Sequence, residues 1–124
     1  MRKTVLALTL CSAAVMADPA FIATQHGNLK IDTVATDLAH PWGISVLPDG
    51  QLLVTERDGR LRYIDKSGKV SAPISGLPEI VVAGQGGLLD VLLDKDFASN
   101  QLIYLSYAEP GADNTNSTAV AKAR

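Results

Sequence analysis

Two similar pairs of short apolar segments constrain the fold of this chain more than any other feature of its sequence. In the first pair, residues 43–47 lead through a turn to residues 52–55. In the second, residues 87–93 lead through a longer turn to residues 102–105. Equivalent positions lie about 45–50 residues apart, which is the period of propeller blades built from four strands each.

Short strands separated by turn residues continue along the rest of the chain. Pro48-Asp49-Gly50 is a turn signal, and Asp58-Gly59 predicts a hairpin with a two-residue loop. After residue 17, no segment longer than a turn has helical periodicity. The pattern therefore predicts an all-β fold. The expected strands are residues 30–36 (half-buried), 43–47, 51–55, 60–65, 79–82, 88–93, 102–107 and 118–121.

The number of expected strands fits only part of a propeller. The residues after 17 suffice for roughly two blades, whereas a propeller closes with four to eight. The last expected strand also has no terminating turn. We therefore expect residues 18–28 to be an N-terminal arm and residues 29–124 an incomplete β-propeller domain of a longer protein. An immunoglobulin-like sandwich has similar strand spacing, but it does not predict the repeat, and the Cys…Trp…Cys signature is absent.

Residues 1–17 have the pattern of a cleaved signal peptide. A basic start is followed by an apolar run over residues 4–16, too short for a membrane span, and by the small residue Ala17. We expect cleavage after Ala17 and a periplasmic or secreted protein. A buried N-terminal helix is one alternative. A lipid anchor at Cys11 is another, although Leu10 stands where a lipobox has a small residue.

Cysteine content and charge exclude several function classes. Cys11 is the single cysteine, so the mature chain would have no disulfide, thiol nucleophile or thiolate metal site. Loss of Arg2 and Lys3 would lower the number of basic residues from 11 to 9, against 13 acidic ones. The mature chain is thus mildly acidic and has no basic stripe, which argues against nucleic acid or an anionic membrane as a partner.

The segment 84–90, Gly-Gln-Gly-Gly-Leu-Leu-Asp, carries the strongest candidate binding residue. Glycines allow a sharp turn and a close approach of the backbone to a ligand or another strand. Gln85 would project from the mouth of the following strand, where propellers place their chemistry. Its amide can donate and accept hydrogen bonds without adding charge. Capping of a turn is the structural alternative for Gln85.

Several blocks, in the same order, resemble the soluble sugar dehydrogenases that use pyrroloquinoline quinone (PQQ), the glucose/sorbosone or aldose sugar dehydrogenases. The resemblance extends from about Thr33 to Arg124. The first-blade blocks are His40-Pro41-Trp42-Gly43-Ile44, Leu47-Pro48-Asp49-Gly50, Leu53-Val54-Thr55-Glu56-Arg57 and Gly59-Arg60-Leu61-Arg62. The second-blade blocks are Gly84-Gln85-Gly86-Gly87-Leu88-Leu89-Asp90-Val91, Asp96-Phe97 and Ile103-Tyr104-Leu105-Ser106-Tyr107.

This resemblance implies a six-bladed β-propeller of which the chain covers about a third. It implies oxidation of an aldose at its anomeric carbon to a lactone, with hydride transfer to PQQ near Ca²⁺. Gln85 matches the family's active-site glutamine beside the cofactor. The catalytic His, the basic PQQ-binding residues and the calcium ligands are expected beyond Arg124, so the segment alone is expected to be inactive. The sugar, the electron acceptor and homodimer formation stay open.

Several other polar or aromatic residues are interpreted as structural. His40 precedes Pro41, which favours extended backbone near the channel mouth. Trp42 is expected to pack between blades rather than stack on a sugar. Asp90 is expected to be a buried carboxylate that ties strands together, and Glu56 and Arg57 to pair across blades.

The turn at residues 94–97 departs from the family pattern. It reads Asp-Lys-Asp-Phe where the family often has His-Pro-Asp-Phe, a change that affects turn geometry rather than chemistry. Asp94, Asp96 and Asn100 superficially resemble a calcium loop, but the required Gly and distal Glu are missing. We therefore predict no metal site there.

Two other functions stay open at this point. A propeller that has lost its cofactor could bind a protein or a glycan, because fold does not fix function. A calcium-dependent lactone hydrolase is a further alternative on a similar propeller, but it needs converging Glu, Asn and Asp ligands that the Gln85 motif does not predict. A downstream Asp-His pair with basic PQQ-binding residues would favour the dehydrogenase.

Overall fold

The computed structural model describes residues 20–124, so the expected leader over residues 1–17 lies outside the described residues. The chain divides after Thr33 into two compact units. In the first unit, β1 (Ala20–Thr24) and β2 (Gly27–Ile31) form an antiparallel hairpin whose residues are all exposed. The half-buried strand expected over residues 30–36 is therefore wrong. The alternation of polar and apolar residues shows which side chains share a face, but not whether anything covers that face.

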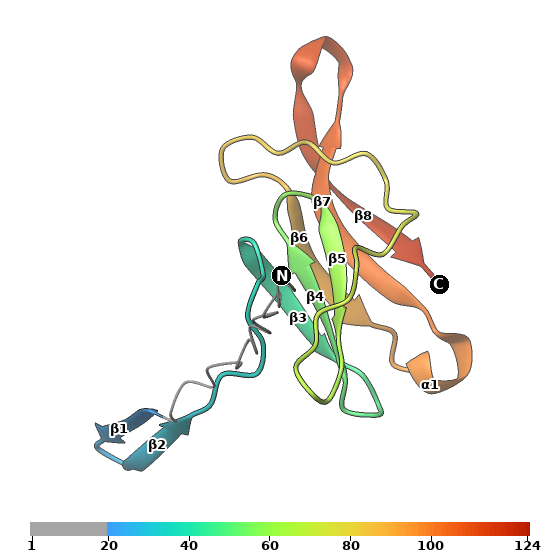
Figure 1. Ribbon diagram of the computed structural model, residues 1–124. Coiled ribbons are helices and arrows are strands. Elements are labelled where there is room, and N and C mark those ends of the chain that lie inside the picture. Colours follow the sequence, from blue (N-terminus) through green and yellow to red (C-terminus); the bar gives the residue numbers. More distant parts are fainter. Residues whose placement is uncertain (1–19) are drawn as a thin grey trace, which may run out of the picture. The chain divides into compact units, whose positions relative to one another are not determined.

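The first sheet of the second unit has the order β3-β4-β5 (Figure 1). Its antiparallel strands are β3 (Pro41–Val46), β4 (Leu52–Glu56) and β5 (Arg60–Ile64). The turn predicted before β4 is confirmed, because the amide of Gly50 donates to the carbonyl of Leu47 over 2.8 Å. The loop before β5 has three residues rather than two. Glu56 pairs with Arg60, and Gly59, at φ +98°, donates to the carbonyl of Glu56.

Residues 69–74 lie along the free edge of β5, where a four-stranded blade has its outer strand. The amide of Ser71 donates to Tyr63 over 2.8 Å, and that of Ile74 to Leu61 over 2.9 Å. Only Val70 forms a bridge, with Ile64, so this edge is not a regular strand. The strand expected over residues 79–82 is also absent, because Val81 makes a single ladder-like bond, to Ala108.

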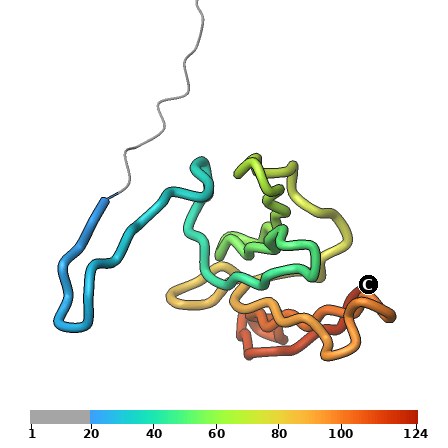
Figure 2. The backbone as a smooth tube through the Cα atoms, turned by 90° about the horizontal axis from the view of Figure 1, so that it is seen from below, coloured from blue at the N-terminus to red at the C-terminus, as the bar shows by residue number. Residues whose placement is uncertain are grey.

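The second sheet has the order β6-β7-β8 and lies as a second layer against the first (Figures 1 and 2). Its antiparallel strands are β6 (Leu88–Leu93), β7 (Ile103–Pro110) and β8 (Asn116–Ala123). One helical turn, α1 (Phe97–Asn100), connects β6 to β7, and a short 3₁₀ segment, η1 (Ala112–Asn114), connects β7 to β8. None of the helices among residues 20–124 has the length and apolar character needed to cross a membrane.

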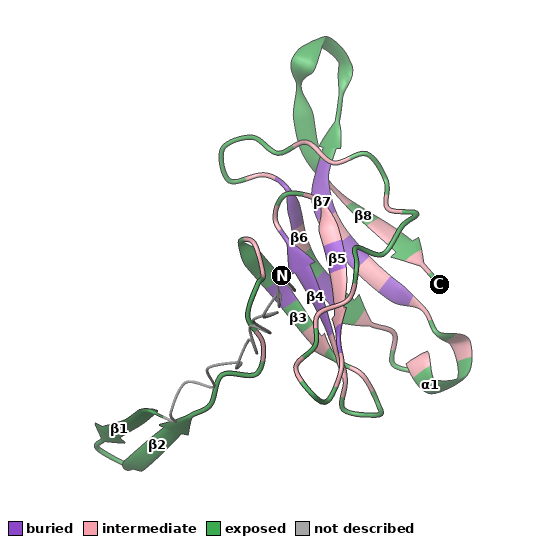
Figure 3. Ribbon diagram, viewed as in Figure 1, coloured by how far each residue is buried: buried purple, intermediate pink, exposed green. Residues whose placement is uncertain are grey.

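The core fills the space between the two sheets and appears as the buried stripe in Figure 3. Its buried residues are Leu53, Leu61, Leu88, Val91, Ile103, Leu105 and Tyr107. Two side-chain hydroxyls also link the layers. Ser45 donates to the carbonyl of Val91 over 2.7 Å, and Thr55 donates to that of Leu89. Gly43 must be a glycine there, since a Cβ would lie 2.6 Å from Asp90 Oδ1 and 2.9 Å from its Cα.

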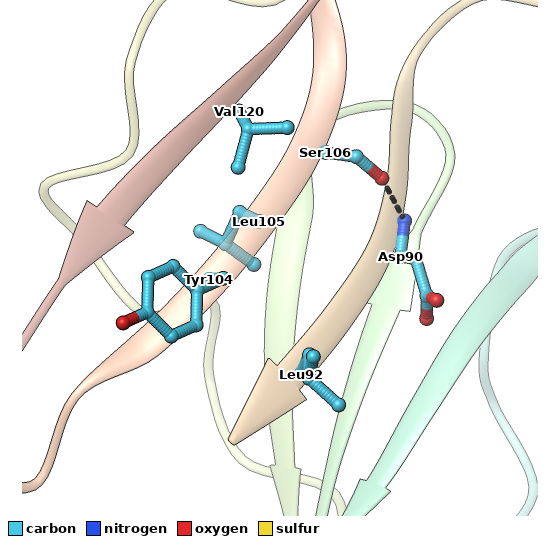
Figure 4. A pocket seen from close by; sticks show the side chains of 6 residues that line it. All are labelled: Asp90, Leu92, Tyr104, Leu105, Ser106 and Val120. Carbon is cyan, nitrogen blue, oxygen red and sulfur yellow. Dashed lines mark hydrogen bonds between the residues drawn. The ribbon is translucent and has the colours of Figure 1, made fainter. Parts of the chain in front are cut away.

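The internal repeat is confirmed at the level of individual hydrogen bonds. The first strand of each sheet has its irregularity at the same place, between Pro41 and Ile44 in β3 and between Leu88 and Val91 in β6. In the first sheet, the amide of Gly43 donates to the hydroxyl of Thr55 over 2.8 Å. In the second, the amide of Asp90 donates to the hydroxyl of Ser106 over 3.0 Å (Figure 4). The two sheets are therefore consecutive blades of a β-propeller.

The outer face of the second sheet is open and partly apolar. Leu92 and Val120 are 64% and 71% exposed, and with Tyr104 and Ser106 they line an open hollow of about 180 Å³ (Figure 4). By the repeat, this face is equivalent to the face of the first sheet that packs on the second. It is thus the face on which a further blade of a propeller would pack. Asp90, expected to be buried, is exposed here, and its carboxylate accepts the amide of Val91.

Candidate functional site

Gln85 lies in a tight turn that precedes β6. The amide of Gly86 donates to the carbonyl of Ala83 over 2.8 Å, which closes the turn. Gly84 takes the first central position with φ +54°, a conformation that glycine adopts without steric cost. Gln85 itself is exposed. The turn therefore leaves the Gln85 side chain exposed shortly before β6.

Arg57, in the turn after β4, joins this loop to the start of the first sheet. Its Nη1 donates to the carbonyl of Gly84 over 2.6 Å. Its backbone carbonyl accepts the amide of Leu88 over 2.9 Å, and its amide donates to the carbonyl of His40 over 3.0 Å. Arg57 thus pairs across blades as expected, although with backbone groups rather than with an acidic side chain.

A hollow of about 430 Å³ lies beside Gln85. It is an open concavity lined by His40, Pro41, Trp42, Arg57, Gly84 and Gln85. Amide, guanidinium, imidazole and indole groups therefore border a single space, drawn from three segments far apart in the sequence. Such a set of polar and aromatic groups is suited to a polar organic ligand with ring structure.

The structure adds detail on two residues of this hollow. Trp42 is 53% exposed and lies outside the core between the two described sheets, so its packing between blades stays a prediction. His40 has φ +49° rather than extended backbone. Its carbonyl is held by the amide of Arg57, and this contact outweighs the preference that the following proline imposes. Strained backbone of this kind is common at ligand sites.

Glu56 is a buried charge directly before Arg57 in the sequence, with only 1% of its surface exposed. Burial by itself would raise its pKa. The amide of Ala39, at 2.6 Å from Oε1, and Arg60, whose Nε lies 2.6 Å from Oε2, outweigh burial and together with the charge of Arg62 lower the pKa of Glu56. The predicted structural role is confirmed, but the partners belong to its own sheet and to the segment before β3, not to the neighbouring blade.

In the turn that resembles a calcium loop, the carboxylate of Asp94 accepts hydrogen bonds from the turn itself. Asp94 accepts hydrogen bonds from the amide of Asp96 (2.9 Å), from the side chain of Asn100 (2.9 Å) and from the hydroxyl of Tyr104 (2.8 Å). These three bonds, the Asp96 amide foremost, lower the pKa of Asp94 to about 2. Its oxygens therefore hold the α1 turn together.

Replacing Asp94 with asparagine should make the stability of the protein less dependent on pH in the acidic range. Because the folded pKa of about 2 lies below the ordinary aspartate pKa of 3.8, the ionised group stabilises the fold above the unfolded-state pKa. That contribution is lost as the pH falls toward the folded pKa. Melting temperatures of wild type and Asp94→Asn should therefore differ near neutral pH and converge in strong acid. A difference that stays constant over this range would contradict the assignment.

Arg57 is the residue of the hollow whose contact with the Gln85 turn the sequence did not indicate. It follows a β-rich segment and precedes Asp58-Gly59, so its type and position indicate only a turn. The available signal is Gly87, which has φ +156° and whose Cβ would lie 2.1 Å from the carbonyl oxygen of Arg57. A glycine directly before an apolar strand indicates a close backbone approach, but does not identify what approaches it.

Comparisons with known proteins agree with this geometry. The sequence profile of a family described as "Glucose / Sorbosone dehydrogenase" matches residues 38–124. Aldose sugar dehydrogenase YliI of Escherichia coli (strain K12) is 41% identical over 118 residues, which cover 94% of this chain and 30% of that protein. The chain thus spans less than a third of the length of this curated relative.

Solved structures give the same result. The soluble aldose sugar dehydrogenase of Escherichia coli, in its apo form, matches with a TM-score of 0.67 and 48% identity, over 70% of this chain and 25% of that one. The PQQ-bound aldose sugar dehydrogenase of Streptomyces coelicolor matches with a TM-score of 0.64 and 30% identity, over 74% and 26%.

Proposed function

Because the chain belongs to the glucose/sorbosone dehydrogenase family, we propose that it is part of an oxidoreductase that oxidises aldose sugars. The aldose would lose hydride from its anomeric carbon to PQQ and the proton of its anomeric hydroxyl to a general base, and leave as a lactone. The observation that carries this proposal is the placement of Gln85, the residue that matches the family's active-site glutamine, at a hollow shared with Arg57 and Trp42. Residues 20–124 supply one part of the site, and the general base is expected outside this segment.

The residues of the hollow fit the chemistry of PQQ. The Gln85 amide can donate to and accept from carbonyl or carboxylate oxygens, and the Arg57 guanidinium attracts anionic groups. When bound, PQQ would supply a two-electron hydride acceptor. Gln85 would orient the ring system or the sugar hydroxyls without adding charge, and Trp42 offers an apolar wall.

The remaining features of this proposal rest on the resemblance and on the sequence. Ca²⁺ belongs to it through the resemblance alone, because residues 20–124 contain no group of three or more His, Cys, Asp or Glu side chains placed to hold a metal. We also propose export to the periplasm or exterior through cleavage after Ala17. The segment alone is proposed to be inactive. A sugar is the proposed substrate partner, and an electron acceptor and a homodimer are left to experiment.

Dye reduction by the full-length protein tests the proposed activity. The protein that carries this segment, reconstituted with PQQ and Ca²⁺, should reduce an artificial electron acceptor when aldoses are added. Mass spectrometry should identify the lactone as the product. PQQ binding without turnover of any aldose would contradict the dehydrogenase, and no PQQ binding at all would favour a non-catalytic propeller.

Shortening Gln85 by one methylene group should weaken the site without unfolding the protein. For Gln85→Asn in the full-length protein, we expect kcat/KM for an aldose to fall by roughly tenfold to a hundredfold, because a misplaced polar contact is costly in a positioned site. The matched control is Gln101→Asn, which shortens an exposed amide at φ +55°, a conformation that asparagine tolerates. Equal activities of the two variants would remove Gln85 from the site.

A further inference from the structure

We propose that Arg57 is a positioning residue that holds Gln85 at the hollow. This inference rests on the proposed function in one respect, namely that Gln85 faces the ligand. It adds a residue from the first blade to a site that the sequence placed in the second. Three observations carry it: a side-chain contact, a set of backbone contacts and the absence of a competing ion pair.

The side-chain contact is directed at the turn that carries Gln85. Nη1 of Arg57 donates to the carbonyl of Gly84 over 2.6 Å, and this carbonyl belongs to the peptide unit directly before Gln85. That peptide unit sets the direction in which the Gln85 side chain leaves the turn. Since Gly84 has no side chain to restrict its rotation, an external hydrogen bond is what selects one orientation.

The backbone contacts fix Arg57 from both sides. Its carbonyl accepts the amide of Leu88, the first residue of β6, and its amide donates to the carbonyl of His40 directly before β3. Gly87 permits the approach, because a Cβ there would lie 2.1 Å from the oxygen of Arg57 and 2.7 Å from its Cγ. The guanidinium is therefore presented from a backbone held against two blades, which makes it a rigid support for the turn.

The charge of Arg57 is not used elsewhere within residues 20–124. The neighbouring Asp58 pairs with Arg60 over 2.8 Å, and Glu56 also pairs with Arg60, so the acidic residues of this turn are directed away from Arg57. Among the described residues, Arg57 forms no ion pair. Its guanidinium is free to combine a hydrogen bond to Gly84 with a positive charge on the wall of the hollow.

Substitution of Arg57 in the full-length protein tests this role. Arg57→Met keeps the length of the side chain and removes the donor, whereas Arg57→Lys restores one donor and the charge. Lys95→Met is the matched control, since Lys95 is 86% exposed in a turn remote from Gln85 in the sequence. Melting temperature, hydrogen exchange of the amides of residues 84–88, the Kd of the apo protein for PQQ, and steady-state kinetics are measured for each.

For Arg57→Met we expect the amides of the Gln85 turn to exchange about tenfold faster at an unchanged melting temperature. PQQ affinity should fall about tenfold, and kcat/KM should fall on the order of a hundredfold, with Arg57→Lys in between. Exchange and affinity equal to those of Lys95→Met would overturn the inference. If Arg57→Met does not fold, Arg57→Lys decides by the same criteria.

The exchange measurement separates this inference from the proposed function. If the wild-type protein neither binds PQQ nor oxidises aldoses, the proposed function fails. Faster amide exchange in Arg57→Met would still show that Arg57 holds the Gln85 turn in place. If the wild type is active while exchange and PQQ affinity do not respond to Arg57→Met, the proposed function stands and the positioning role of Arg57 is wrong.

Discussion

Glu56→Ala should destabilise the full-length protein by about 3 kcal/mol, the lower end of the range for breaking a buried ion pair. The carboxylate is 1% exposed and holds the amide of Ala39 and the guanidinium of Arg60. It also lies 3.9 Å from Nε of Arg62, a buried donor with no hydrogen-bond partner. Removal of Glu56 therefore leaves the partly buried Arg62, whose Nε is buried, and the backbone amide of Ala39 without compensation. Urea denaturation followed by circular dichroism measures the loss.

Glu79→Ala is the matched control, because Glu79 is exposed and belongs to the irregular segment between the two sheets. Its free energy of unfolding should stay within about 0.5 kcal/mol of wild type. Glu56→Gln separates shape from charge, since its amide oxygen can still accept from Ala39 while the ionic partner of Arg60 is lost. We expect it to lie between wild type and Glu56→Ala. A loss below 1 kcal/mol for Glu56→Ala would mean that water reaches Arg62.

The strands that could be predicted from the sequence are those marked by neighbouring residues, namely an apolar run next to a turn signal. The segment 88–93 is apolar except for Asp90, follows a glycine turn and forms β6 with the predicted bounds. Residues 79–82 have similar composition, but lie in a segment that contains Pro73, Gly76 and Pro78. Only Val81 finds a partner carbonyl there, so no ladder forms. Apolar β-branched residues alone do not make a strand when no neighbouring edge is in register.

The candidate site was only half predictable for a related reason. Gln85 could be identified because glycines on both sides mark an exposed turn. Arg57 and Trp42 are brought to the same hollow by the stacking of two blades, and this contact joins residues far apart in the sequence. Asp90 shows the converse error. Its apolar neighbours in the sequence suggested burial, but Asp90 is exposed, although its backbone and one carboxylate oxygen lie close to Gly43 of the first sheet.

Gly87→Ala should strongly destabilise the full-length protein, because a methyl group at this position would clash with backbone. The new Cβ would lie 2.1 Å from the carbonyl oxygen of Arg57 and 3.0 Å from its carbonyl carbon, so backbone rather than a flexible side chain must move. That movement breaks the hydrogen bond from the amide of Leu88 to the carbonyl of Arg57. It also moves Nη1 of Arg57 away from the carbonyl of Gly84. We expect a loss of about 3 kcal/mol or more in stability, near the upper end for overpacking. Aldose oxidation should fall below detection.

Gly84→Ala isolates the effect of this close approach, since it adds the same methyl group three residues earlier, within the turn that precedes Gly87. Gly84 has φ +54° and no atom within 4 Å of the position of a Cβ. Its substitution should therefore cost only the backbone strain of the left-handed conformation, about 1 kcal/mol. Thermal unfolding and PQQ titration of both full-length variants test the contrast. Similar losses for the two would show that strain in the turn, and not its junction with Arg57, limits the site. A large loss of stability and PQQ affinity confined to Gly87→Ala would show that the close contact of the two blades at Arg57 is needed for the site as well as for the fold.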